Sequence, residues 1–312
     1  MARWQRHSRL SSLVLVVTLT ICYGANARQV GCVWLTIPVG TREAALAGAS
    51  TATSLGPQGI FYNPAATANT SPFAAQVEYT KWFLDTHHQS LFISRDFRHL
   101  ALGLGVVSFA SGKFDYREET PTEEPLGTFS PLDLTGYFNI ARCLAPWANA
   151  GISARYFYSK LLNNELSGFG VDIGARFKPQ KNLSAGIAVV DFGRTLYYKY
   201  QLIWLPARIR CGIGYNLPFG KNSLLFVADG SYFFYSQKFQ AQLGTEFQLG
   251  DILSLRTGYD PLNPGNRLNF GIGVAVNRFR FDYTFAPLGF GLGTAHRFGV
   301  AYGVASAETN HQ

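Results

Sequence analysis

Apolar and polar side chains alternate over many stretches of this chain, most regularly near its end. In residues 278–285 every odd position is aromatic, and the even positions are charged or hydroxylic. In residues 296–303, His, Phe, Val and Tyr alternate with Arg, Gly, Ala and Gly. Successive side chains of a β-strand point to opposite faces, so both stretches are predicted to be strands with one apolar and one polar face. The charged face would lie outside in a soluble β-sandwich, but inside, toward a wet lumen, in a transmembrane β-barrel.

The same period of two recurs from residue 73 to the end of the chain. About fourteen segments show it, each roughly as long as the ~9–11 residues that a tilted membrane-spanning strand needs. The predicted strands are 73–83, 86–95, 99–110, 130–141, 148–160, 167–178, 182–191, 206–217, 222–233, 238–248, 252–260, 266–276, 278–286 and 295–303.

The connections between these segments decide between the two folds. Every second connection is short, as at 145–147 and 250–251, whereas most of the others are longer, such as 111–129. Transmembrane barrels have short periplasmic turns and longer outer loops, and a sandwich has no reason to sort its loops in this way. We therefore predict an all-β fold, an antiparallel transmembrane β-barrel of about fourteen strands. The even strand count is expected to leave both chain ends in the periplasm.

Residues 28–72 do not alternate and are rich in small side chains. Residues 41–47 are predicted to form a short helix with Thr41 as its N-cap and Gly48 as its end. Asn63-Pro64 is predicted to be the cap and first residue of another helix. Such a compact segment would be a linker outside a barrel and a plug inside a wide one.

A signal peptide is predicted before this segment. Three arginines precede the apolar run 13–23, and Ala25-Asn26-Ala27 is an A-x-A cleavage site, so the mature chain is expected to start at Arg28. We therefore divide the chain into a signal peptide (1–27), an N-terminal plug segment (28–72), a barrel (73–304) and a C-terminal tail (305–312).

Composition favours a protein that crosses the membrane with β-strands rather than with helices. Charged residues make up 15% of the chain, against about a quarter in soluble proteins, yet no apolar run reaches the ~18 residues that a spanning helix needs. Removing the signal segment leaves 24 basic and 19 acidic residues, a mild net charge of +5, and no basic cluster with interleaved aromatics indicates nucleic-acid binding.

Candidate chemistry is sparse. Cys32, Cys143 and Cys211 lack metal-ligand spacing, and a disulfide between Cys32 and Cys143 is left open because both could lie on the periplasmic side. No serine, histidine and polar orienting residue are brought together on one predicted face, so we predict no enzyme activity, cofactor or metal.

The end of the chain resembles a known family. Residues 281–289 and the following Leu292-Gly293-Thr294-Ala295-His296-Arg297-Phe298 resemble the closing hairpin of the PorV/PorQ family of outer-membrane proteins. Residues 39–49 and the Phe61-Tyr62-Asn63-Pro64-Ala65 box are similar to that family's opening, and the box also marks the plug of the wider FadL-like superfamily. Residues 206–210 are similar to the family's Pro-x-x-x-Arg strand start, so the resemblance spans nearly the whole mature chain.

The resemblance implies a FadL-like barrel with an N-terminal plug in the bacterial outer membrane. For PorV-type members it implies a part in type IX secretion, with secreted proteins or secretion-system components as partners. For FadL proteins it implies passive diffusion of hydrophobic compounds such as long-chain fatty acids. Binding or scaffolding of exported proteins is the main hypothesis and FadL-like transport is its alternative, with outer-membrane lipid as a partner in both.

Three groups of residues are candidates for function. The plug motif consists of Gly48, Phe61, Tyr62, Asn63 and Pro64. Ions on polar strand faces are predicted to face the lumen, because a lipid-facing charge at the bilayer midplane would cost ~2–4 kcal/mol. There they either hold plug and wall together or line a substrate path. These ions are Asp172, Arg176, Arg208, Arg210, Asp229, Glu246, Arg256, Arg280, Asp282 and Arg297. Gly103 and Gly105 are candidates for a wall kink that would open a lateral exit.

Overall fold

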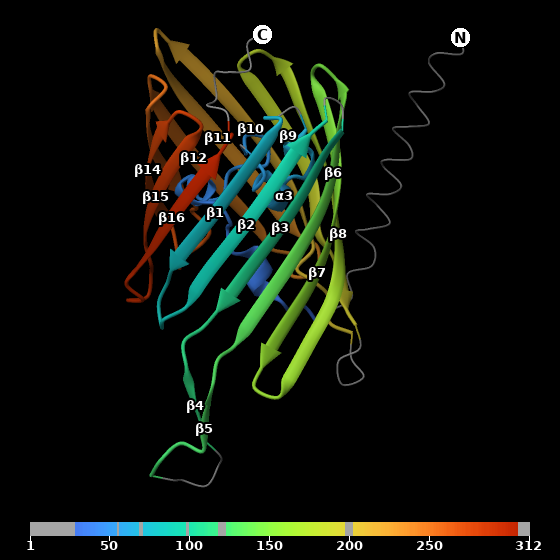
Figure 1. Cartoon of the computed structure of the whole chain (residues 1–312), viewed down its shortest axis with the longest axis vertical. Coiled ribbons are helices and arrows are strands. Elements are labelled where there is room, and N and C mark those ends of the chain that lie inside the picture. The colour runs from blue at the N-terminus through green and yellow to red at the C-terminus, as the bar shows by residue number, and fades with distance from the viewer. Residues whose placement is uncertain are drawn as a thin grey trace, which may run out of the picture.

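The computed structural model describes residues 29–54, 56–68, 71–97, 100–117, 123–196 and 202–304. Fourteen antiparallel strands close into one barrel, with the first strand paired to the last (Figure 1). The barrel strands are β1 (Phe73–Lys81), β2 (His87–Asp96), β3 (Leu100–Ala110), β6 (Leu132–Ala145), β7 (Ala148–Leu161), β8 (Asn164–Gln180), β9 (Leu183–Thr195), β10 (Arg208–Phe219), β11 (Asn222–Phe233), β12 (Phe239–Leu249), β13 (Leu253–Tyr259), β14 (Leu268–Val276), β15 (Phe279–Pro287) and β16 (Thr294–Tyr302). The fold class predicted from the alternation is confirmed, and the strand boundaries differ from the predicted ones by a few residues.

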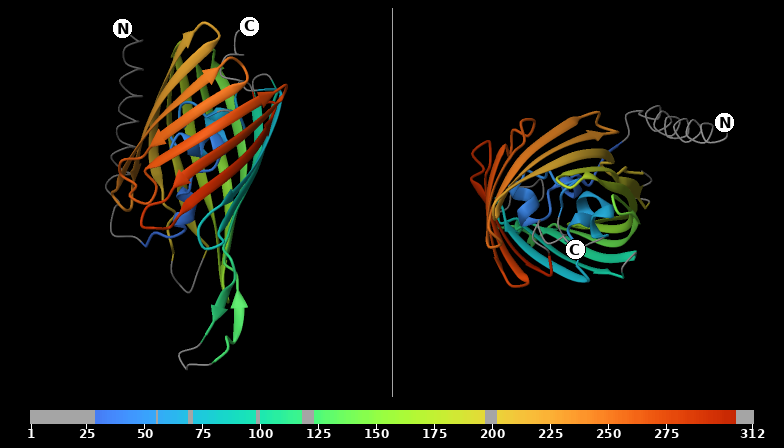
Figure 2. Two further views of the ribbon diagram at one scale, coloured as in Figure 1. Left: turned by 90° about the vertical axis from the view of Figure 1, so that its left-hand side faces the viewer. Right: turned by 90° about the horizontal axis from the view of Figure 1, so that it is seen from above.

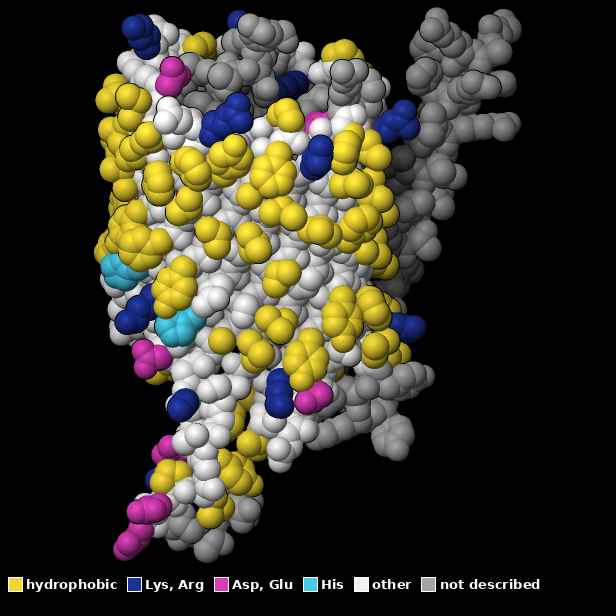
Figure 3. Space-filling view, in the orientation of Figure 1, with side chains coloured by type: hydrophobic (Ala, Val, Ile, Leu, Met, Phe, Trp, Pro, Cys, Tyr) yellow, Lys and Arg dark blue, Asp and Glu magenta, His cyan; other side chains and the backbone are white. Residues whose placement is uncertain are grey.

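Alternation along the strands sorts apolar side chains to the outside of the barrel and ions to the inside. On β16, Phe298 is 53% exposed and Arg297 is 3% exposed, and on β15 the corresponding values are 50% for Phe281 and 4% for Asp282. Figure 3 shows hydrophobic side chains over the visible wall, with Lys and Arg gathered toward its two ends. In a membrane, lipid hydrocarbon would cover this apolar wall. In water, the same apolar side chains would remain in contact with solvent, which is unfavourable.

The two ends of the barrel differ in their connections. Turns such as 146–147, 181–182 and 220–221 lie at the end that we call the short-turn end. Most connections at the opposite, long-loop end are longer, and the longest carries a separate hairpin of β4 (Phe114–Tyr116) and β5 (Gly127–Phe129) that hangs away from the barrel in Figure 1. The predicted loop at 161–166 is wrong, because β7 and β8 pair as far as Leu161 and Asn164.

The described part of the N-terminal segment contains four short helices. The view from above in Figure 2 shows coils of this segment inside the barrel. The helices are η1 (Val33–Thr36), α2 (Thr41–Ala45), α3 (Gly59–Tyr62) and η2 (Pro64–Thr67). Residues 39–54 and 56–68 are all buried, so this segment fills the lumen as a plug rather than forming an external linker. None of the helices in the described residues is both long and apolar enough to cross a bilayer.

Of the two helix N-caps predicted from the sequence, one is confirmed and the other is wrong. Asn63 caps η2 as predicted: its Oδ1 accepts a hydrogen bond from the Ala65 backbone N–H at 3.1 Å, and Pro64 is the first helical residue. The prediction that Thr41 is an N-cap is wrong. Thr41 is the first residue of α2, and Gly40 occupies the cap position with a φ of +94°, a conformation that glycine adopts readily. Gly48 follows the end of this helix, also at positive φ, and donates to the Glu43 carbonyl.

The plug crosses the lumen from end to end. Gln29 and Gly31 form backbone hydrogen bonds with Trp204, in the connection between β9 and β10 at the long-loop end. The start of β1 and the end of β16 lie at the short-turn end. The expectation that both chain ends share one side is therefore wrong for the described residues, because 29–72 runs through the barrel before β1 begins.

Placement of the cysteines follows from this path. Cys32 packs beside Phe157 and Leu205 near the long-loop end, whereas Cys143 lies on β6 next to the short turn at 146–147. The two thiols are at opposite ends of the barrel, so they do not form a disulfide here. The predicted signal peptide (1–27) and C-terminal tail (305–312) lie outside the described residues.

Candidate functional site: the plugged lumen

Asp229 on β11 fastens the plug to the wall. Its Oδ2 accepts hydrogen bonds from the backbone N–H groups of Ser50 (3.0 Å) and Thr51 (2.9 Å), and from the Thr51 hydroxyl (2.6 Å). The Arg210 guanidinium on β10 lies 3.1 Å from the same oxygen and also donates to the Gly48 carbonyl at 2.8 Å. Because hydrogen bonds to a charged group are worth about 1.5–3 kcal/mol each, this carboxylate is a strong anchor for the middle of the plug.

A second ion cluster joins plug helix α2 to β12, β13 and β15. Arg42 Nε lies 2.7 Å from Glu246 Oε2, and Arg256 Nε lies 3.1 Å from the same oxygen. Asp282 is 2.6 Å from Arg256 Nη1 and 2.7 Å from Arg280 Nε. Two carboxylates therefore hold three guanidinium groups, one of which belongs to the plug.

A third cluster lies where the wall is irregular. Arg155 on β7 contacts the carboxylates of Asp172 on β8 and Asp191 on β9, and Arg208 Nε lies 3.4 Å from Asp191. The pairing of β8 with β9 shifts register at this point, and Asp191 adopts a φ of +60°. Its backbone N–H donates to Asp172 Oδ1 at 2.7 Å. This β-bulge turns a second carboxylate inward beside Arg155.

The remaining two predicted ions contact plug carbonyl groups. Arg297 Nη1 donates to the Pro38 carbonyl at 2.7 Å and lies 3.6 Å from Glu78 Oε1. Arg176 Nη1 donates to the carbonyls of Ser54 (3.3 Å) and Ala66 (3.5 Å). Among the described residues, Arg176 is the one predicted ion with no opposite charge within 4.0 Å.

Several inward-facing glycines let the plug backbone touch the wall. A Cβ at Gly151 on β7 would lie 2.4 Å from the Pro64 carbonyl oxygen, and one at Gly258 on β13 would lie 2.3 Å from the Ala47 nitrogen. Any larger residue would collide with backbone that cannot rotate away, so these positions fix how deeply the plug is seated.

Gly103 and Gly105 lie on a strand that is paired without a break. β3 keeps its register with both β2 and β6 across these two residues. A Cβ at Gly103 would meet the Ile60 side chain of the plug at 2.5 Å, and one at Gly105 would meet the Phe92 ring at 2.3 Å. In this closed wall the glycines make room for inward packing, and a lateral opening at them stays a prediction.

Phe61 and Tyr62 of the plug motif belong to an apolar cluster with wall residues such as Phe92 and Tyr137. The Tyr62 hydroxyl donates to the Val39 carbonyl at 2.6 Å, and burial raises the pKa of this phenol above its ordinary value. Arg210 lies over the Tyr62 ring, 5.0 Å from its centroid. The motif thus packs against the apolar part of the wall through Phe61 and against the wall residue Arg210 through the Tyr62 ring.

A cavity of about 290 Å³ separates this part of the plug from the long-loop end. We call it the mouth cavity. Its apolar lining is formed by Phe61, Tyr62, Trp82, Phe83, Leu288 and Leu292, and its charged lining by Arg208, Arg210, Arg297 and Asp260. Burial raises the pKa of Asp260, whose carboxylate accepts hydrogen bonds from Gln240 and the Leu262 backbone. The cavity can hold a small molecule with an apolar body and a polar or anionic end.

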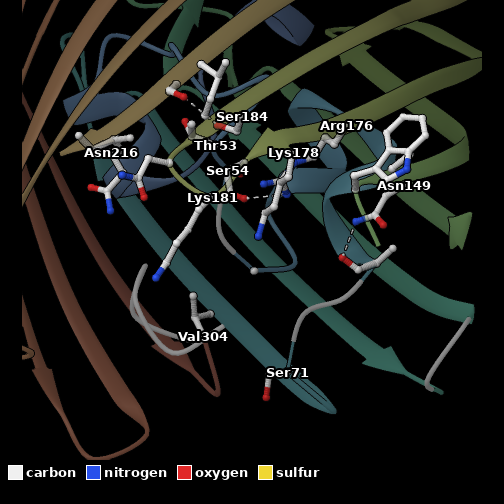
Figure 4. Close-up of a pocket in the computed structure, with 18 of the residues that line it drawn as sticks. Thr53, Ser54, Ser71, Asn149, Arg176, Lys178, Lys181, Ser184, Asn216 and Val304 are labelled. Carbon is white, nitrogen blue, oxygen red and sulfur yellow. Dashed lines mark hydrogen bonds between the residues drawn. The ribbon is translucent and has the colours of Figure 1, made fainter. Parts of the chain in front are cut away.

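A second cavity, of about 200 Å³, lies inside the barrel at the short-turn end (Figure 4). We call it the short-turn cavity. Plug residues including Ser54 form its floor, and Asn149, Arg176, Lys178 and Lys181 are in its wall. The plug separates the two cavities, so the lumen is closed to straight passage.

Sequence reasoning missed four ions that partner the predicted ones. Glu78 and Arg155 alternate with apolar neighbours inside predicted strands, so the period-two rule could have found them. Asp191 lies at a bulge, where alternation breaks, and Arg42 lies in the segment without alternation, so no pattern marks them as lumen ions. No group of His, Cys, Asp and Glu in the described part of the chain is arranged to hold a metal ion.

Comparison with known proteins adds a likeness of fold. No family model matches the sequence, and no curated protein matches it either. Among solved structures, the CymD monoaromatic hydrocarbon channel is 13% identical, with a TM-score of 0.58 over 85% of this chain and 96% of that one. The Pseudomonas putida toluene transporter TodX is 11% identical, with a TM-score of 0.59 over 84% of this chain and 96% of that one.

A Pseudomonas aeruginosa FadL homologue is 11% identical, with a TM-score of 0.55 over 86% of this chain and 99% of that one. At these identities the likeness concerns the fold alone. The resemblance to PorV/PorQ proteins finds no support among these structures, whereas the wider FadL-like part of the expectation does. The chain is a closed, plugged fourteen-strand barrel of FadL-like architecture.

Proposed function

We propose that this protein is an outer-membrane channel for the passive transport of hydrophobic small molecules that carry a polar or anionic end. The mouth cavity is the observation that carries the proposal. It lies against the plug beside Phe61 and Tyr62, where the transport hypothesis expects a binding pocket. The similar structures include a channel for monoaromatic hydrocarbons and a toluene transporter, which supports a hydrophobic substrate for a barrel of this shape.

Chemistry of the mouth cavity suggests the kind of ligand. Apolar side chains such as Phe83 and Leu292 can bury a hydrocarbon or aromatic body, at about 25 cal/mol for each Å² removed from water. Arg208 and Arg297 can donate to a carboxylate or other acceptor at the opposite side. A compound with both parts satisfies the whole lining, whereas a pure hydrocarbon leaves the arginines without a new partner.

Passage requires the plug to move. Residues 39–54 and 56–68 are buried in the lumen. The plug is attached to the wall by the Arg42–Glu246 ion pair and by hydrogen bonds to Asp229, Arg297 and Arg176. A ligand in the mouth cavity would touch Tyr62 and Arg210. Arg210 lies over the Tyr62 ring and also contacts the plug anchor Asp229. Binding there is therefore coupled, through direct contacts, to the residues that hold the plug in place.

Ligand binding to the purified barrel tests the proposal. A fluorescent long-chain fatty acid should bind saturably. Leu292 is 41% exposed in the free barrel, so a ligand that covers it removes apolar surface from water, and L292D should weaken binding by about tenfold, the equivalent of about 1.4 kcal/mol. Leu126 is 54% exposed on the distal hairpin and outside the cavity, so L126D is the matched control and should leave affinity unchanged. Absence of saturable binding, or equal effects of the two substitutions, would contradict the proposal.

Scaffolding of exported proteins is a second candidate, and one observation favours it. A lumen filled by plug and ion pairs is what a non-transporting barrel would show. Native mass spectrometry of the detergent-purified protein separates the two candidates: a copurifying polypeptide supports the scaffold role, and a bound lipid or fatty acid supports transport.

A further inference from the structure

The short-turn cavity carries an unbalanced positive charge. Its charged lining consists of Arg42, Arg176, Lys178 and Lys181, and no acidic residue lines it. Arg42 is already paired with Glu246. The other three cations have no carboxylate within 4.0 Å among the described residues. Like charges gathered around an enclosed space raise its potential, which favours an anion inside it.

Arg176 is the cation of the wall that contacts the plug. It donates hydrogen bonds to two plug carbonyl oxygens, both through Nη1. Its other N–H groups therefore have no acceptor in the described part of the chain, and the side chain is partly exposed toward the cavity. A guanidinium group presents its donors as a planar fork that matches the oxygens of phosphate or carboxylate.

Lys178 and Lys181 complete the cationic side. Lys178 follows Arg176 by two residues on β8, and both side chains line the cavity. Lys181 is in the turn between β8 and β9, and Figure 4 shows both lysine side chains extending toward the space that Arg176 borders. Amide groups of Asn149, Asn182 and Asn216 also line the cavity and can donate to an oxyanion.

We infer that the short-turn cavity binds a compact phosphate group. Three cations without acidic partners suit a doubly charged phosphate monoester better than a singly charged carboxylate, because more of the local charge is balanced by one ligand. The phosphate belongs either to a free phosphate monoester in the compartment that the short turns face or to the monoester headgroup of phosphatidic acid in the membrane. The site is separate from the mouth cavity, so the inference does not depend on the transported molecule.

Isothermal titration with inorganic phosphate tests this site, using the full chain in a neutral detergent. The wild-type barrel should bind phosphate saturably and acetate much more weakly, with affinity falling as sodium chloride is added. R176Q should weaken phosphate binding about tenfold or more, the loss expected for a charge-assisted hydrogen bond. K181Q, in an exposed turn that tolerates substitution, should also weaken it.

Lys221 provides the matched control. It is exposed in the β10–β11 turn at the same end of the barrel, but it does not line the cavity. K221Q removes the same charge and should leave phosphate affinity within about twofold of wild type, as expected for a screened surface charge. Heat-modifiable gel mobility verifies that each variant is folded.

Lipid nanodiscs distinguish the two phosphate sources. If the natural ligand is a headgroup, nanodiscs that contain phosphatidic acid should abolish the phosphate titration that pure phosphatidylcholine nanodiscs retain. If it is a free phosphate compound, both nanodiscs should retain it. The inference is overturned if phosphate does not bind saturably in detergent, if folded R176Q and K181Q bind as tightly as wild type, or if K221Q weakens binding as much as they do.

Discussion

Replacement of Asp229 by alanine should release the plug without opening the wall. The substitution removes the acceptor for two plug backbone N–H groups and the Thr51 hydroxyl, and it leaves Arg210 buried without its carboxylate. Breaking a buried ion pair by deleting one partner costs about 3–5 kcal/mol. Because the lost contacts join plug to barrel, this cost falls on plug docking rather than on strand pairing. The docked population should then fall by roughly 150- to 5,000-fold relative to the released one.

Trypsin cleavage after Arg42 measures that release. Arg42 is 1% exposed in the docked plug, so cleavage requires the plug to leave its seat. When docking is fast relative to cleavage, the rate follows the population of the released state, and D229A should be cut faster by the same factor. D229N keeps one amide oxygen as an acceptor and should fall between D229A and wild type.

Asp251 serves as the control for this experiment, because it is exposed in the β12–β13 turn and has no hydrogen bond or ion pair with the described residues of the plug. D251A should be cleaved at the wild-type rate. Single-channel recording gives an independent readout, since a released plug should add large-conductance events in D229A. If folded D229A shows wild-type cleavage and conductance, then Asp229 does not anchor the plug and the magnitude above is refuted.

Three further predictions concern packing, thiol reactivity and pH. Valine at Gly258 would collide with the plug backbone and should accelerate cleavage after Arg42, whereas valine at Gly136, whose Cβ would have no neighbour within 4 Å, should not. Burial, with smaller contributions from Asp133 and Asp191, raises the pKa of the Cys32 thiol to about 12. Iodoacetamide at pH 8 should therefore label it roughly 1,000-fold more slowly in the folded barrel than after unfolding, and equal rates would contradict its burial. The raised pKa of Asp260 means that the folded state holds this proton more tightly than the unfolded state, so its stabilising contribution is lost as pH rises above 3.8 and through the folded pKa. The urea midpoint should fall less over that pH range in D260N than in wild type, and identical pH profiles would contradict this.

Most of the wall could be predicted from the sequence, because the lipid and the lumen impose opposite demands on alternate residues. Phe281 faces outward and the next residue, Asp282, faces the lumen. The alternation of apolar and charged residues in the sequence is therefore enough to tell which face of the strand is inside. The same rule placed the ions from Asp172 to Arg297 on the inner face. It failed at Asp191, because a bulge shifts the alternation by one residue.

The plug was harder to predict, since its residues are buried on every side and follow no period. Asn63-Pro64 was recognisable because capping is a local interaction between neighbouring residues. The partners of Arg42 and Ser50 were not, because they lie about 200 residues away on strands β12 and β11. Pairings of that kind depend on how the plug is seated, which in turn depends on where the wall has glycine.

The route of residues 29–72 through the barrel constrains the order of assembly. These residues lie between Trp204 at one rim and the start of β1 at the other, and β1 is joined to β16 by continuous pairing from Ala75 to Lys81. A chain that had already sealed this seam would have to pull more than forty residues lengthwise through a narrow, ion-lined bore. Biogenesis is simpler if an open sheet curls around the nascent plug and the first and last strands zip together afterwards.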